Sequence, residues 1–109
     1  MINITKKRIQ NIIKQIEYIQ KDIKDVDIRD FTEESQVARA VCYSIIQIAE
    51  QVQKLDKKIA KTNPEIPYKD IVGMRIILVH IYDEINYAQV YQVAKHDVDI
   101  LKDQLNKVL

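Results

Sequence analysis

The chain has 109 residues, enough for one domain of ordinary size and too few for two, so we expect residues 1–109 to form a single domain. Its 17 lysines and arginines nearly balance 16 aspartates and glutamates. This balance excludes a uniformly basic nucleic-acid-binding surface and confines any RNA contact to a local site. One glycine and two prolines leave few tight turns, which favours long helices over many short strands.

The sequence also gives indications of where in the cell the protein is located. The longest apolar stretch, residues 71–82, is too short to cross a bilayer and contains Arg75, and the first residues lack an apolar core of signal-peptide length. Cys42 is the sole cysteine, so no internal disulfide can form, and its apolar neighbours favour a buried, inert thiol. We therefore expect a soluble, cytoplasmic protein that does not contact membranes.

Isoleucines recur at steps of three and four residues in the first segment. This period predicts an amphipathic helix from about Thr5, a candidate N-cap, to about Lys24. Residues 25–31 break the pattern and indicate a loop, after which Thr32 can cap the next helix. The predicted buried stripe consists of Ile9, Ile12, Ile13, Ile16, Ile19 and Ile23.

The second predicted helix is longer. Its apolar residues step by three or four from Val37 to Ile59, and we expect it to end before Asn63 and Pro64. The segment from Pro64 to Pro67 is predicted to be a rigid connector, because each proline fixes its own backbone and disfavours helix at the preceding residue.

The third predicted helix begins near Pro67 or Tyr68 and is unusually apolar. Besides its stripe from Ile71 to Ile85, three further apolar residues lie on other faces, so residues 71–82 are apolar nearly all round. Such a helix needs cover on more than one side, and a second copy of the chain is the simplest source of that cover. We therefore expect a homodimer.

Asn86 is a candidate cap for a fourth long helix, whose buried stripe runs from Val90 to Val108. The four segments together predict an all-α fold. Its architecture is an up-and-down antiparallel bundle of four long helices with short connectors.

Three polar residues interrupt the apolar third helix: Arg75, His80 and Tyr82. On an ideal helix Arg75 and Tyr82 project within about 20° of each other, whereas His80 points about 140° away from Arg75. All three converge only if the helix loosens near His80 or if two subunits share the cleft. In a structural alternative, Arg75 is ion-paired to an acid such as Glu50 and His80 is a hydrogen-bonded core residue.

The residue types present in the chain exclude several other classes of catalytic site. The chain has no glycine-rich phosphate loop, no cysteine pair for zinc, no paired histidines of a metalloprotease and no serine in a nucleophile elbow. Catalysis would depend on His, Arg, Tyr and carboxylates, so we expect no metal and no cofactor. The runs 6–8 and 54–58, both rich in lysine, are predicted to be solvated faces, with phosphate contact as the alternative.

The run from Gly73 to Tyr82 has the pattern of Arg, four residues, His, any residue and Tyr, which resembles the signature of the HepT branch of the HEPN superfamily. The proline-containing lead-in, and the segment from Ala40 to Leu55 that includes Glu50, resemble the corresponding parts of that family. The likeness covers about Ala38 to the C-terminus, with a compatible first helix. It implies a HEPN-like bundle that acts as the ribonuclease toxin of a type VII toxin–antitoxin pair.

The resemblance also implies roles for residues. A metal-independent RNA endonuclease would work as a homodimer with the motifs of both chains facing one cleft. Arg75 would grip the scissile phosphate, His80 would act as general acid or base, and Glu50 would orient one of them. The implied partner is a minimal nucleotidyltransferase antitoxin that transfers AMP to the signature tyrosine, here Tyr82, which would block the phosphate site by charge and bulk.

The chain departs from the family pattern around these residues. Members often carry a polar residue, commonly asparagine, after the arginine, and this chain has Ile76 there; Val79 and Ile81 replace small residues around the histidine. These changes remove a possible hydrogen-bond donor to phosphate. The alternative function is therefore a catalytically weak or inactive helical dimer that binds a nucleotide or a nucleotidyltransferase partner, and a plain structural bundle is the third possibility.

Overall fold

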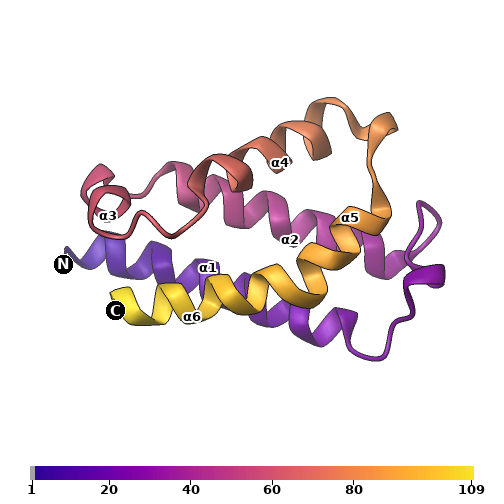
Figure 1. Cartoon of the computed structure of the whole chain (residues 1–109), viewed down its shortest axis with the longest axis horizontal. Coiled ribbons are helices and arrows are strands. Elements are labelled where there is room, and N and C mark those ends of the chain that lie inside the picture. The colour runs from indigo at the N-terminus through magenta and orange to yellow at the C-terminus, as the bar shows by residue number, and fades with distance from the viewer. Residues whose placement is uncertain (1) are drawn as a thin grey trace.

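The computed structural model describes residues 2–109 as an all-α bundle, as the sequence predicted. Successive long helices run in alternating directions, which confirms the up-and-down arrangement (Figure 1). In this described part of the chain no helix has the length and apolar character needed to cross a bilayer. The helices are α1 (Asn3–Ile23), α2 (Gln36–Gln53), α3 (Lys57–Thr62), α4 (Tyr68–His80), α5 (Tyr87–Gln92) and α6 (Val98–Val108).

α1 supplies the centre of the core. It packs against α2 on one side and α6 on the other, and its isoleucines recur at helical period on the face between them. The predicted stripe is confirmed except at Ile13, which is half-buried. The helix begins at Asn3 without a side-chain cap, so the prediction of Thr5 as the N-cap was wrong. The fully buried isoleucines, with 0% exposure, are Ile9, Ile12, Ile16 and Ile19.

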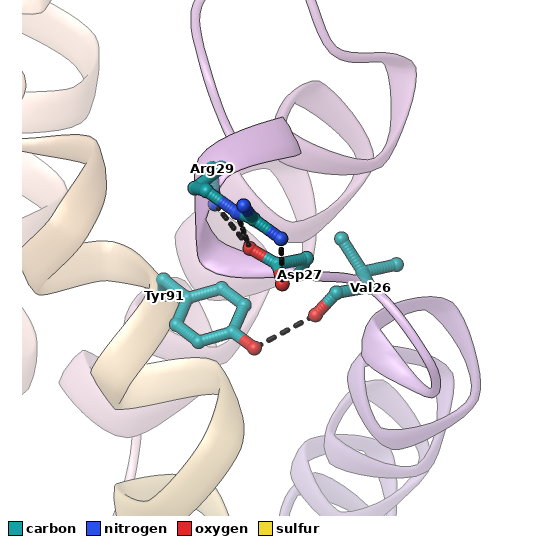
Figure 2. Close-up of polar contacts among 4 residues, drawn as sticks. All are labelled: Val26, Asp27, Arg29 and Tyr91. Atoms are coloured by element: carbon teal, nitrogen blue, oxygen red, sulfur yellow. Dashed lines mark hydrogen bonds and ion pairs between the residues drawn. The ribbon is translucent and has the colours of Figure 1, made fainter.

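The connector between α1 and α2 is fixed to the bundle by an aromatic residue of α5. The Tyr91 hydroxyl donates a hydrogen bond of 2.7 Å to the Val26 carbonyl (Figure 2). Beside it, Asp27 accepts hydrogen bonds from Arg29, which lower the pKa of that carboxyl group. Phe31 follows and is buried edge-on against the Tyr91 ring, with centroids 5.5 Å apart. The predicted loop is confirmed but extends as far as Ser35, beyond its predicted end at Phe31, and it is anchored to the bundle.

α2 starts three residues later than predicted. The Ser35 hydroxyl oxygen accepts a hydrogen bond of 3.2 Å from the Ala38 backbone N–H and caps the helix. Thr32, the predicted cap, instead accepts from the Glu34 backbone N–H at 3.3 Å in a local turn. The prediction of Thr32 was wrong because two hydroxyl residues lie close together and each can bind a nearby backbone N–H.

The second predicted helix is in fact two helices. α2 ends at Gln53, and Asp56 starts α3 by accepting a hydrogen bond of 2.9 Å from the Lys58 backbone N–H. Arg8 donates to the Lys54 carbonyl at 2.8 Å, which satisfies an oxygen left free at the end of α2. The break is therefore stabilised from both sides. The prediction of one continuous helix was wrong, whereas its predicted end before Asn63 is confirmed, because α3 ends at Thr62.

The last two helices follow one another directly through a π-helical turn at Val93–Asp97. The predicted cap is confirmed, because the Asn86 side-chain oxygen accepts a hydrogen bond of 3.1 Å from the Gln89 backbone N–H. The predicted stripe is confirmed in its central part and half-buried at Val93 and Val108. Its buried members are Val90, Ala94, Val98, Leu101 and Leu105.

Cys42 lies on α2 and is partly buried rather than fully buried. Burial raises the pKa of its thiol to about 11. The thiolate is therefore scarce at neutral pH, which agrees with the expectation of an inert thiol.

Candidate active site on α4

α4 presents an apolar surface to solvent. Its inner side reaches the core, where Leu78 is buried and Met74 is partly buried. The predicted all-round apolar character of this segment is confirmed, and a single chain covers only one side of it. The exposed apolar side chains at and just after α4 are Ile76 (47%), Ile77 (42%), Val79 (37%) and Ile81 (38%).

Arg75 lies on the side of α4 that faces α2. Its Nη2 atom is 3.7 Å from Glu50 Oε1, and the two side chains are 27% and 39% exposed. This distance exceeds hydrogen-bonding range, so the ion pair holds the guanidinium group by charge and leaves its N–H donors unused. The Arg75 Nε atom is buried and has no hydrogen-bond partner within residues 2–109. Glu50 therefore positions Arg75 and leaves the hydrogen-bond donors of its guanidinium group free to bind a ligand.

His80 and Tyr82 lie where α4 stops. His80 is its last residue, Ile81 leaves the helix with φ −126° and ψ 40°, and Tyr82–Glu84 form a separate 3₁₀ turn. α4 stays regular through His80 and loosens only at Ile81, so the change affects the angle between Arg75 and Tyr82 and leaves His80 about 140° round the helix from Arg75. Both His80 and Tyr82 are exposed, Tyr82 at 70%. The alternative of His80 as a core residue is wrong.

Within one chain the structure brings together Arg75 and Glu50 only. In the described range no hydrogen bond or ion pair joins His80 or Tyr82 to either residue. Arg75 and His80 are five residues apart, a rise of about 7.5 Å along the axis of α4. Because the two side chains also point to different sides of α4, their convergence on one phosphate would need the other predicted route, a cleft shared by two subunits.

Sequence reasoning missed one exposed aromatic residue beside this site. Tyr43 is 61% exposed and lies seven residues before Glu50 on α2, which places both on the same face two turns apart. Because α2 and α4 are antiparallel, Tyr43 lies toward the His80 end of α4. An exposed ring at this position is a stacking surface for a nucleobase. The spacing of seven residues between Tyr43 and Glu50 is the sequence feature that could have placed Tyr43 beside the site.

Two hollows flank α4, and neither is lined by Arg75 or His80. One of about 660 Å³ lies between α4 and the α5–α6 helix, with Met74, Ile77 and Leu101 in its lining. The other, of about 430 Å³, lies between the end of α2, α3 and α4, with Tyr68 and Gly73 in its lining. The candidate site is therefore an open surface. Across residues 2–109 no group of three His, Cys, Asp or Glu side chains is arranged to hold a metal ion.

Comparison with known proteins identifies the family. A family model described as "Ribonuclease HepT-like" matches residues 9–108. "Putative RNase MJ0125" of Methanocaldococcus jannaschii is 30% identical over 91% of this chain and 85% of its own length. "Putative RNase TTE0752" of Caldanaerobacter subterraneus subsp. tengcongensis is 27% identical, with 93% and 90% covered. "Probable ribonuclease HepT" of Thermococcus cleftensis is 24% identical, with 92% and 91% covered.

No solved structure matches the chain at a significant level. The family model alone spans nearly all of the described residues and includes the whole of α4. The all-α bundle and the motif on α4 agree with that match, and the chain belongs to the HepT-like ribonuclease family of the HEPN superfamily.

Proposed function

We propose that the protein is a metal-independent endoribonuclease, the toxin of a type VII toxin–antitoxin pair, and that Arg75 and His80 carry the reaction. One observation supports this most directly: the motif arginine is held by Glu50 with unused donors, five residues before an exposed histidine. Family membership and the names of the relatives support RNA as the substrate.

The proposed reaction needs only these side chains and the RNA. A neutral His80 imidazole takes the proton of a ribose 2'-hydroxyl, whose oxygen attacks the adjacent phosphorus. The bond from phosphorus to the leaving 5'-oxygen breaks, and a protonated imidazole donates a proton to that oxygen. Arg75 contacts the phosphate oxygens and stabilises the negative charge that develops on them. Glu50 positions Arg75.

The test is an RNA cleavage assay in the presence of EDTA with His80→Ala. We expect this variant to lose about a hundredfold to ten-thousandfold in rate, the usual contribution of general acid–base catalysis. His96→Ala is the matched control, since His96 is the other histidine, is exposed, and lies on the α5–α6 helix. It should cleave at the wild-type rate. Wild-type activity of His80→Ala would remove the mechanism.

We further propose a homodimer formed through the exposed apolar face of α4. A contiguous apolar surface of this kind on a small soluble bundle is a favoured interface. In the dimer the Arg75 and His80 residues of both chains line one cleft, which gives the RNA two cationic sites.

Sedimentation at micromolar concentration should show this dimer, and Ile76→Lys should weaken it by about tenfold or more because the interface would have to bury an unpaired charge. Ile4→Lys, at a position that is 56% exposed on α1, is the matched control and should leave the dimer intact. A monomeric wild-type chain would mean that the apolar face of α4 has another role.

A second function is favoured by a specific observation at Ile76. The residue follows Arg75, is 47% exposed and offers no hydrogen bond where family members often have a polar side chain. The alternative is a weak or inactive dimer that binds a nucleotide or a nucleotidyltransferase. Absence of RNA cleavage by the wild type, with retained binding of either ligand, would favour it.

A further inference from the structure

Positive and negative charge are unevenly distributed between the two ends of the bundle, although the formal net charge is only +1. The start of α1, the end of α2 and α3 lie together at one end (Figure 1). The hydrogen bond of 2.8 Å from Arg8 to the Lys54 carbonyl joins two of these segments. We call this the basic end; its cationic residues are Lys6, Lys7, Arg8, Lys54, Lys57, Lys58 and Lys61.

The positive charge of the basic end is largely uncompensated. All six of its lysines are exposed, and within the described chain none of them is in an ion pair. Of the two acids nearby in sequence, Asp56 uses its carboxylate to cap α3, and Glu65 lies in the connector after it. A cluster of like charges without counter-charges creates a local positive potential that attracts polyanions.

The opposite end of the bundle has the reverse character. It contains the connector between α1 and α2 and the 3₁₀ turn after α4 (Figure 1). His80 lies at this end, because it is the last residue of α4. Its exposed acids outnumber its exposed bases, which are Lys24, Arg29 and Arg39, and Arg29 is ion-paired with Asp27. The exposed acids are Asp25, Asp27, Asp30, Glu33, Glu34, Asp83 and Glu84.

The candidate site lies between these two ends. From Glu50 the basic end begins four residues along α2 at Lys54, a rise of about 6 Å. Lys69, an exposed lysine outside the basic end as defined, lies six residues before Arg75 along α4, about 9 Å away. The hollow of about 430 Å³ lies in this interval, and its lining includes Lys57, Lys69 and Asp56 beside apolar side chains.

We propose that the basic end is a docking surface for the phosphate backbone of single-stranded RNA and that it draws the strand from Arg75 toward α3. A strand held at Arg75 is attracted toward α3 and repelled by the carboxylates beyond His80. The inference rests on the proposed ribonuclease function for the identity of the polyanion. An anionic membrane is the competing ligand, because Ile2 and Ile4 are exposed at the start of α1. α3 favours RNA over a membrane, because its exposed side chains include no large apolar group: Lys57, Lys58, Ala60, Lys61 and Thr62.

The test compares two triple variants with the same net charge. One carries Lys57→Gln, Lys58→Gln and Lys61→Gln on α3. The matched control carries Lys14→Gln, Lys21→Gln and Lys24→Gln, three exposed lysines along α1 and just after it, outside the basic end. The ligand is a fluorescent single-stranded RNA with 2'-O-methyl groups, which binds but lacks the attacking hydroxyl, and the readout is anisotropy against salt concentration.

If each α3 lysine contacts one phosphate, the first variant should bind up to about a hundredfold more weakly at about 0.1 M salt, and its log–log salt slope should fall by about 2. The control variant should remain near wild type. Lys6→Gln with Lys7→Gln tests the same surface from α1 and should lose part of the affinity. Circular dichroism verifies that each variant is folded.

The same variants are also tested for binding to phosphatidylserine vesicles. Three results would overturn the proposal: an equal loss of RNA affinity in both triple variants, no loss of RNA affinity in either, or a loss of vesicle binding without a loss of RNA affinity. The last result would indicate a membrane-binding surface. Failure of the ribonuclease proposal gives a different pattern. In that case unmodified RNA stays intact with the wild type, while the α3 variant still loses affinity for the 2'-O-methyl RNA.

Discussion

Arg75→Ala is expected to lower the rate of RNA cleavage by about a hundredfold to a thousandfold, the usual effect of removing a group that stabilises transition-state charge. The helical content should not change, because the Arg75 side chain is 27% exposed and its ion pair with Glu50 is loose at 3.7 Å. A gel-based cleavage rate measures the first effect, and far-ultraviolet circular dichroism measures the second.

Two further variants separate the role of charge from that of geometry. Arg75→Lys keeps the charge but cannot bind phosphate through two parallel N–H groups, so its rate should fall between those of wild type and Arg75→Ala. Glu50→Gln keeps the shape of the positioning residue and should reduce activity less than Arg75→Ala. Retained activity in Arg75→Ala, together with a large drop in melting temperature, would show that the ion pair is structural.

Incubation with the cognate nucleotidyltransferase, ATP and magnesium is expected to place AMP on Tyr82 and to silence the nuclease. Tyr82 is 70% exposed in the turn after His80, so a partner enzyme can reach its hydroxyl. The phenolic oxygen attacks the α-phosphorus of ATP, pyrophosphate leaves, and the phenol proton passes to solvent. The added phosphate then repels RNA from the region of Arg75 and His80.

Tyr82→Phe keeps the ring and removes the accepting oxygen, so it should remain folded and active and escape modification. Tyr43 is the better control for modification, because it is 61% exposed and a partner enzyme can reach it. Tyr91 is only 9% exposed, and the Tyr91 hydroxyl is hydrogen-bonded to the Val26 carbonyl. Tyr43→Phe should still be modified. Peptide mass spectrometry that found AMP on Tyr43 or Tyr87, or on no tyrosine with an active partner, would contradict the assignment.

The period of apolar residues was sufficient to predict the helices that pack in the core. Ile9, Ile12 and Ile16 recur at steps of three and four residues, the helical period, and Asn86 is the one obvious cap before the last helix. The exposed apolar face of α4 could also be predicted, because apolar residues occur on every side of that segment. These features depend on local sequence alone.

The positions of helix ends could not be predicted in the same way. Thr32 and Ser35 compete to cap α2, and the sequence does not say which hydroxyl faces the free N–H groups. The break after Gln53 depends partly on Arg8, which is 46 residues away from the Lys54 carbonyl that it binds. A contact over that separation exists only once the helices have packed.

Part of the candidate site could also be predicted from the sequence, and part depends on how the helices pack. The pairing of Arg75 with Glu50 could be proposed from the sequence, and the structure has it. The place of Tyr82 could not, because extrapolating a regular helix past His80 assumes that the helix continues. The exposed ring of Tyr43 became apparent only when α2 and α4 were seen to be antiparallel neighbours.

The π-helical turn at Val93–Asp97 has a consequence for how the length of the last helix can vary. A π turn contains one residue more than an α turn, yet Val90 before the turn and Val98 after it are both buried. The extra residue is thus absorbed locally, and neither half of the helix rotates out of its packing. Single-residue insertions and deletions during divergence should therefore collect in this turn, whereas elsewhere in the helix they would rotate the buried stripe by about 100°.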